Sequence, residues 1–188
     1  MQVCDEFDGG FGWLQDERMQ RASHALVVDG RVYAIDPVDD DGVEERLRAA
    51  GEPAGVIQLL DRHNRDSAAL AARLGVPLHY LEAPAPFEAI RLGTPPRWNE
   101  VALWWPDRKV LVCADALGSV PKYFRAPGER LGVHPLLRLF PPRRLDRLDP
   151  ERVLVGHGAG VHEDATAAMR DALAGARRRI LSYARNLR

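Results

Sequence analysis

The chain has 188 residues, of which 46% are hydrophobic and 28% charged, a composition typical of one folded globular domain. Its formal net charge of -1 gives no overall field to attract nucleic acid or an anionic membrane. Two cysteines are too few for a disulfide framework, and no stretch reaches the roughly 18 apolar residues of a membrane span. We therefore expect a single cytoplasmic domain over residues 1–188, with neither a nucleic-acid nor a membrane partner.

The first half of the chain predicts strands that alternate with short helices. Asp29-Gly30 lies between two apolar runs, and this dipeptide favours the positive φ angles of a two-residue hairpin turn. The elements expected here are a hairpin over 25–35, a helix over 42–50, a buried strand over 56–60, a helix over 67–74 and a strand over 76–81. The polar loop after residue 60 thus follows the carboxyl end of a buried strand, where ligands of α/β folds usually bind.

The second half is richer in proline and arginine. Trp104 and Trp105 are neighbours on a predicted strand and must face opposite sides, so we expect one in the core and the other on an exposed surface. The elements expected are loop and edge strand over 82–99, a hairpin over 100–113, short helical fragments near 134–140, a strand over 153–155 and a helix from 163 to about 187.

Three motifs each combine the end of a predicted strand with the polar residues that follow it. They cover residues 59–67, 110–117 and 153–158, and Ile35-Asp36-Pro37 precedes them. Their order and flanking strands resemble the metallo-β-lactamase superfamily. Members of that family carry a His-x-His-x-Asp-His loop after a buried strand, a His in the next loop, an Asp that closes a strand, and a late Gly-His. The resemblance covers nearly the whole chain and implies an α/β fold, a four-layer αββα sandwich.

The first motif departs from the family pattern, and its register is open. If His63 takes the place of the second family His, Asp61 and Asp66 take the places of the first and last, and Arg65 that of the Asp. If Asp66 takes the place of the family Asp, no imidazole remains at the His positions, which are then Arg62, Asn64 and Ser67. In either register an arginine, which is cationic and cannot ligate, lies among the ligand positions. This argues against an intact two-metal site.

The later motifs keep the residue types of the family, whereas the loop over 94–100 contains no histidine. The candidate metal ligands implied by the resemblance are Asp61, His63, Asp66, Asp115 and His157. They are enough for one divalent ion, because a catalytic zinc takes about three protein ligands and a water. Their carboxylates would also suit manganese or iron(II).

Each candidate ligand also has a purely structural interpretation. Asp66 could pair with Arg62 or Arg65, or cap the helix that begins near residue 67. His157 could be a polar residue of a glycine turn, and Asp115 could cap a strand end. Asp36 could hold the backbone of the first motif, or simply form the turn before its proline.

Two functions follow from these alternatives. The first is a divergent metal-dependent hydrolase in which at most one ion activates water to attack an ester, thioester, amide or phosphoester. The second is a catalytically inactive binding or interaction module of the same fold, without metal. The usual dinuclear zinc chemistry is expected to be lost, and neither a small-molecule substrate nor a protein partner can be named from the residues.

Overall fold

A computed structural model describes residues 2–93 and 98–186. The first half of the chain forms a six-stranded sheet in which the strands follow one another in chain order. Its strands are β1 (Gln2–Phe7), β2 (Gly10–Leu14), β3 (Ala22–Val28), β4 (Arg31–Ile35), β5 (Glu52–Gln58) and β6 (Leu78–Tyr80). The first four strands pair antiparallel, and β5 and β6 are added in parallel after the helices α1 (Val43–Ala50) and α2 (Ser67–Leu74).

The second half forms a four-stranded sheet in the order β12-β9-β8-β7. Its strands are β7 (Glu88–Arg91), β8 (Val101–Trp105), β9 (Val110–Cys113) and β12 (Arg152–Val155), and β12 runs parallel to β9. A two-stranded ribbon, β10 (Leu117–Gly118) and β11 (Gly132–Val133), lies beside it. The short helical turns are η1 (Pro106–Arg108), η2 (Pro135–Leu137) and η3 (Arg143–Arg147), and the C-terminal helices are α3 (Ala165–Gly175) and α4 (Ile180–Asn186).

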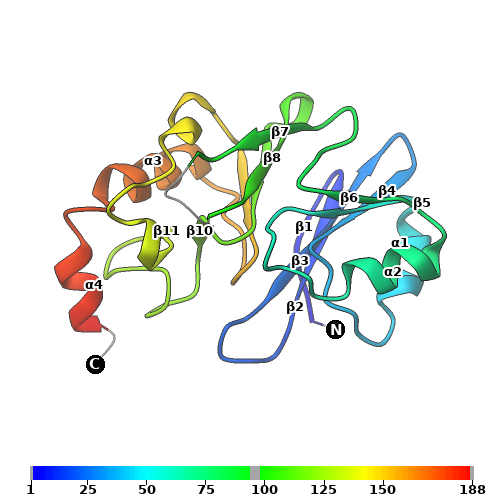
Figure 1. Cartoon of the computed structure of the whole chain (residues 1–188), viewed down its shortest axis with the longest axis horizontal. Coiled ribbons are helices and arrows are strands. Elements are labelled where there is room, and N and C mark those ends of the chain that lie inside the picture. The colour runs from blue at the N-terminus through cyan, green and yellow to red at the C-terminus, as the bar shows by residue number, and fades with distance from the viewer. Residues whose placement is uncertain (1, 94–97, 187–188) are drawn as a thin grey trace.

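The two sheets pack face to face, with helices on the outer side of each (Figure 1). Buried side chains such as Ile57 and Leu103 fill the space between the sheets. Leu47 of α1 and Leu70 of α2 pack on the outer face of the larger sheet, and Leu173 of α3 packs on the smaller one. Each fully buried side chain of this kind contributes about 1.5–3 kcal/mol to folding. The expected four-layer αββα sandwich is therefore confirmed.

Two expectations about single elements need correction. Trp104 and Trp105 do face opposite sides of β8, but both are buried, at 7% and 4% exposed, because both faces of that strand are covered. The single helix expected from residue 163 is two helices, and the break follows Gly175, where a Cβ atom would lie 2.3 Å from the guanidinium of Arg179.

The N-terminal hairpin of β1 and β2 carries no clear sequence signal. Gly10 and Gly12 interrupt the apolar pattern of β2, yet each is needed for close packing. A Cβ atom on Gly10 would lie 2.5 Å from the carbonyl oxygen of Ala25 on β3, and one on Gly12 would lie 2.8 Å from His24. Close packing against the β3 backbone at Gly10 and against the His24 side chain at Gly12 therefore explains the two glycines that interrupt the strand pattern.

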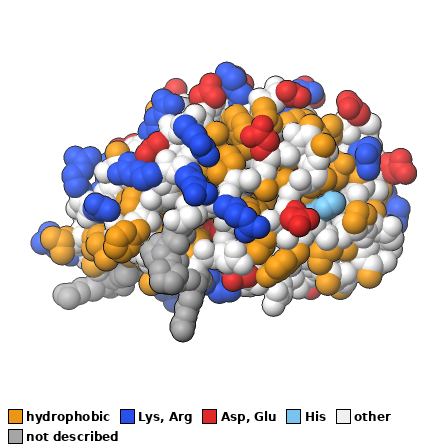
Figure 2. Space-filling view, turned by 45° about the horizontal axis from the view of Figure 1, so that its top comes forward, with side chains coloured by type: hydrophobic (Ala, Val, Ile, Leu, Met, Phe, Trp, Pro, Cys, Tyr) orange, Lys and Arg blue, Asp and Glu red, His pale blue; other side chains and the backbone are white. Residues whose placement is uncertain are grey.

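The surface carries charges of both signs. Figure 2 shows lysine and arginine side chains gathered toward one side of the face in view, with acidic side chains scattered among and beyond them. Within residues 2–93 and 98–186, no helix has the length and apolar character needed to cross a bilayer.

Candidate metal centre

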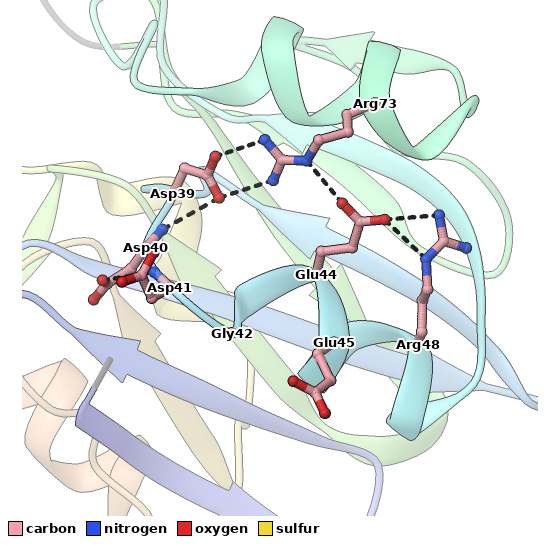
Figure 3. A pocket seen from close by; sticks show the side chains of 8 residues that line it. All are labelled: Asp39, Asp40, Asp41, Gly42, Glu44, Glu45, Arg48 and Arg73. Atoms are coloured by element: carbon pink, nitrogen blue, oxygen red, sulfur yellow. Dashed lines mark hydrogen bonds and ion pairs between the residues drawn. The ribbon is translucent and has the colours of Figure 1, made fainter.

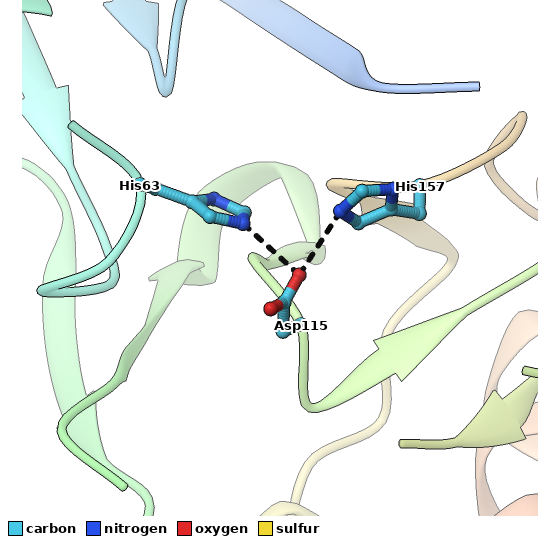
Figure 4. A group of neighbouring side chains, drawn as sticks. All are labelled: His63, Asp115 and His157. Atoms are coloured by element: carbon cyan, nitrogen blue, oxygen red, sulfur yellow. Dashed lines mark hydrogen bonds and ion pairs between the residues drawn. The ribbon is translucent and has the colours of Figure 1, made fainter. Parts of the chain in front are cut away.

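Three side chains from distant parts of the chain converge at one edge of the sandwich: His63, Asp115 and His157. Oδ1 of Asp115 lies 3.0 Å from Nε2 of His63 and 3.2 Å from Nε2 of His157 (Figure 4). The three potential ligand atoms all lie within 4.8 Å of one another. Both histidines are buried and Asp115 is partly buried, so the group is a shielded polar cluster.

Strand register brings these residues together. β9 and β12 pair in parallel with Cys113 opposite Val155, and Asp115 and His157 each follow two residues later. His63 comes from the loop after β5, at the same edge. Gly156 allows the two loops to approach, because a Cβ atom there would lie 2.4 Å from the carbonyl oxygen of Ala114.

Hydrogen bonds at Nδ1 orient both imidazoles. Nδ1 of His157 lies 2.9 Å from the carbonyl oxygen of Met19, which can only accept, so this nitrogen carries a hydrogen and Nε2 faces Oδ1 of Asp115. Nδ1 of His63 lies 3.0 Å from Oδ2 of Asp36, and the other oxygen of Asp36 accepts from the backbone N–H of Leu59. The expectation that Asp36 holds the backbone of the first motif is confirmed.

The charges of the cluster are strongly coupled. Burial opposes ionisation of Asp115, but hydrogen bonds from His157 and His63 outweigh it and hold the pKa of that carboxyl well below its usual range. Burial likewise opposes protonation of His63, yet the carboxylates of Asp115 and Asp36 raise its pKa to about 9. Without an ion, His63 is therefore an imidazolium between two carboxylates at neutral pH.

Glu100, a residue not singled out from the sequence, holds the backbone that presents Asp115. Its Oε1 accepts from the backbone N–H groups of Ala114, Asp115 and Ala116, at 2.9, 3.2 and 3.1 Å. Its Oε2 accepts from the indole N–H of Trp98 at 2.8 Å. Burial, followed by the charge of Asp115, raises the pKa of Glu100 to about 8. The one sequence signal was a carboxylate at the start of an apolar strand, a place where burial is costly without partners.

Arg65 lies beside the cluster as a structural cross-link. Its guanidinium donates to the carbonyl oxygens of Ala22, Asp36 and Gly156, at 2.6, 2.8 and 3.0 Å. Arg65 also has a positive φ of 33°, which is uncommon for a residue with a side chain. Three segments distant in sequence are thus tied together by one cation, which cannot itself ligate a metal.

The structure does not bring Asp61 and Asp66 into the cluster. Oδ2 of Asp66 accepts from the backbone N–H of Asp39 at 2.8 Å. Asp66 occupies the N-cap position of α2, but its side chain makes no capping hydrogen bond, so the capping interpretation was wrong. One carboxylate oxygen of Asp61 is buried without a hydrogen-bond partner in the described part of the chain. Of the predicted loop without histidine, residues 94–97 lie outside the described residues.

A surface hollow of about 870 Å³ lies apart from the cluster, beside the start of α1 (Figure 3). Arg73 of α2 spans it, donating to both carboxylate oxygens of Asp39 at 2.7 and 2.9 Å and to Glu44 at 2.8 Å. Arg48 pairs with the same Glu44. These exposed charges neutralise one another, so the hollow is a salt-bridged junction between α1 and α2.

Comparison with known proteins rests on structure alone, since no family model and no curated protein sequence matches the chain. A metallo-β-lactamase from Pontibacter korlensis is similar with a TM-score of 0.65 and 12% identity, over 92% of this chain and 98% of that one. The flavodiiron protein from Giardia intestinalis is similar with a TM-score of 0.64 and 12% identity, over 95% of this chain and 59% of that one. The chain therefore has the metallo-β-lactamase fold.

Proposed function

We propose that the chain is a metal-dependent hydrolase that holds one divalent ion at His63, Asp115 and His157. The observation that carries the proposal is the orientation of the imidazoles: each Nδ1 faces an oxygen acceptor, and each Nε2 faces the same carboxylate oxygen. Histidine ligands of metals are typically held in this way.

The spacing of the donors also fits an ion. Ligand atoms at about 2.0–2.1 Å from a tetrahedral zinc are roughly 3.3 Å apart. The nitrogen–oxygen separations here are 3.0 and 3.2 Å, close to that value, and all three ligand atoms lie within 4.8 Å of one another. Two imidazoles and one carboxylate form a ligand set for zinc, and also for iron(II) or manganese. When bound, such an ion lowers the pKa of water and supplies a nucleophile for ester, thioester, amide or phosphoester hydrolysis.

We propose one ion and not two. Asp61 and Asp66 lie outside the cluster, and the partly buried guanidinium of Arg65 adds a positive charge close to Asp36 and Gly156. A second divalent ion would have to overcome this charge at low local dielectric.

An inactive binding module is the second candidate, and one observation favours it. With His63 protonated between Asp36 and Asp115, the cluster satisfies its own charges and hydrogen bonds without an ion. Metal affinity must then compete with a proton that is bound tightly at neutral pH.

Metal analysis of the untagged chain, purified without chelator, separates these candidates. We expect about one ion per chain in the wild type, none in His157→Ala, and an unchanged content in Asp66→Asn, whose carboxylate lies outside the cluster. Hydrolysis of p-nitrophenyl acetate and of bis(p-nitrophenyl) phosphate should follow the metal content. A wild-type chain that stays metal-free at saturating zinc would leave only the binding module.

A further inference from the structure

A wall of aromatic side chains borders the candidate metal centre, and His134 is part of it. The ring centroid of Phe124 lies 5.6 Å from the ring centroid of His157 and 5.6 Å from that of His134. Tyr123 likewise lies 6.5 Å from His157 and 6.2 Å from His134. The same two aromatic rings therefore lie near both a candidate ligand and His134.

The backbone fixes His134 next to the Asp115 loop. The pairing of β10 with β11 continues past Leu117 and Val133, and the N–H of His134 donates to the carbonyl oxygen of Ala116 at 3.1 Å. Ala116 directly follows Asp115 in the chain. The backbone of His134 is therefore bonded to the residue next to a candidate ligand. Trp98, whose indole bonds to Glu100, packs on the His134 ring at 4.7 Å.

The hydrogen bond at Nδ1 defines which nitrogen of His134 can donate. The backbone N–H of Leu136 donates to Nδ1 at 3.3 Å, so the hydrogen of the neutral ring is on Nε2. Among the described residues, His134 makes a side-chain hydrogen bond through Nδ1 alone. His134 is 9% exposed, and its Nε2 is not one of the fully buried polar atoms that lack a partner, so the Nε2–H donor can still be reached from solvent.

The charges around His134 are those of the candidate centre. Burial lowers the pKa of His134 to about 4, and the positive charges of Arg62 and His157 add to this effect, while Asp115 opposes it. The ring is therefore neutral near pH 7. A neutral imidazole adds no positive charge that would oppose a metal ion at the centre.

Hydrogen bonds to the backbone fix the positions of Phe124 and Tyr123. Arg138, 1% exposed, donates to Glu129 at 2.9 Å and to the carbonyl oxygen of Phe124. The hydroxyl of Tyr183 on α4 donates to the carbonyl oxygen of Tyr123 at 2.6 Å. Donors that need no rearrangement are the ones that stabilise charge developing in a transition state.

We infer that His134 donates from Nε2 to the carbonyl or phosphoryl oxygen of the substrate at this centre. The inference rests on the proposed hydrolase function. As water adds to the acyl carbon or phosphorus, the electron pair of the C=O or P=O bond moves to that oxygen, and the His134 N–H bonds to it. The bond to the leaving group then breaks, and a proton from the attacking water ends on that group. His134 keeps its proton throughout.

The test compares two substitutions in the zinc-loaded chain. His134→Gln keeps an N–H donor at a similar distance from the backbone, whereas His134→Met keeps the volume and removes the donor. We expect kcat for p-nitrophenyl acetate or bis(p-nitrophenyl) phosphate to fall about 10²–10³-fold in His134→Met and less than about tenfold in His134→Gln. His79→Met, on the far strand β6, is the control and should match the wild type. If the substitution lowers kcat for p-nitrophenyl acetate, the oxygen is a carbonyl oxygen. If it lowers kcat for bis(p-nitrophenyl) phosphate, the oxygen is a phosphoryl oxygen.

Two readouts do not depend on turnover. The ¹⁵N spectrum of the metal-free chain should show His134 with its hydrogen on Nε2, and inorganic phosphate added to the zinc-loaded chain should shift that resonance. Zinc content should be equal in wild type, His134→Met and His134→Gln. Equal zinc with undiminished kcat in His134→Met, or a hydrogen found on Nδ1, would overturn the role of His134 alone. A wild type without zinc or turnover would instead overturn the hydrolase function, and this role with it.

Discussion

At the residue scale, the chemistry depends on what holds the Nδ1 atoms of the two histidines. A carboxylate at His63 and a backbone carbonyl at His157 leave each Nε2 directed at Asp115. The carboxylate makes the imidazole of His63 more basic, which strengthens it both as a ligand and as a proton acceptor. The proton and the ion therefore compete for one nitrogen.

The metal-free chain should lose stability as pH rises through 9. The pKa of His63 is about 9 in the folded chain and about 6.5 in an unfolded one. Because the folded pKa is the higher, its contribution is fully present below pH 6.5 and is lost as pH rises through 9. The contribution is at most about 3 kcal/mol. Urea denaturation in EDTA at pH 6.5 and 9.5 measures it, and His63→Gln should show a smaller difference. Equal pH dependence in both proteins would contradict the assignment.

Glu100→Gln should weaken both the fold and the metal centre. The amide keeps one oxygen for the backbone N–H groups of the Asp115 loop but sets a donor against the indole N–H of Trp98. We expect a loss of about 1–3 kcal/mol in the free energy of unfolding and about 10–100-fold in zinc affinity. Denaturation and competition with a chromophoric chelator measure the two. Glu88→Gln, on the exposed edge strand β7, should change neither; equal effects in both variants would refute this role of Glu100.

At the element scale, the centre is built by parallel strand ends and one close approach. β9 and β12 deliver Asp115 and His157 in register, and Gly156 lets their loops nearly touch. The order of strand, polar loop and helix could be predicted because each depends on local patterns, such as the Asp29-Gly30 turn and the apolar run before residue 60. Asp115 and His157 were candidates because their motifs resemble those of the metallo-β-lactamase superfamily.

Other features depend on contacts that no local pattern records. His157 is oriented by a carbonyl 138 residues away, and Arg65 joins three remote carbonyl groups. The spacing of Asp61 and Asp66 resembled that of ligands, but a backbone N–H at Asp39 holds Asp66 elsewhere. The break after Gly175 likewise depends on packing against Arg179.

Gly156→Ala should separate the two loops. Its Cβ atom would overlap the carbonyl oxygen of Ala114, so the Asp115 and His157 loops must move apart. We expect a loss of about 1–3 kcal/mol in stability and loss of the bound ion. Gly30→Ala is the matched control, because it adds backbone strain at φ 75° in open space, far from the centre. It should cost about 1–2 kcal/mol and leave the zinc content unchanged. Retained zinc in Gly156→Ala would show that the close approach is not required.

At the scale of the whole molecule, both sheets and the loop after β5 meet at the centre. An ion bound there would join segments from both halves of the chain, as the hydrogen bonds of Arg65 already do. Binding to the folded state alone should therefore stabilise the entire sandwich.

Zinc should raise the unfolding temperature in proportion to its binding. At a free zinc concentration 100 times the dissociation constant, the stabilisation is about 2.7 kcal/mol, equivalent to roughly 5–11 °C for a domain of this size. Differential scanning fluorimetry should show this increase in the wild type and in Asp66→Asn, but not in His157→Ala. An increase in all three would indicate binding elsewhere.

The zinc K-edge X-ray absorption spectrum of the chain with one equivalent of zinc is the most direct test of the proposed centre. We expect a four-coordinate shell of nitrogen and oxygen at about 2.0–2.1 Å with the outer-shell scattering of two imidazoles and no sulfur. A sulfur neighbour at about 2.3 Å, which only Cys4 or Cys113 or a methionine could supply, would contradict it. So would a shell without imidazole scattering.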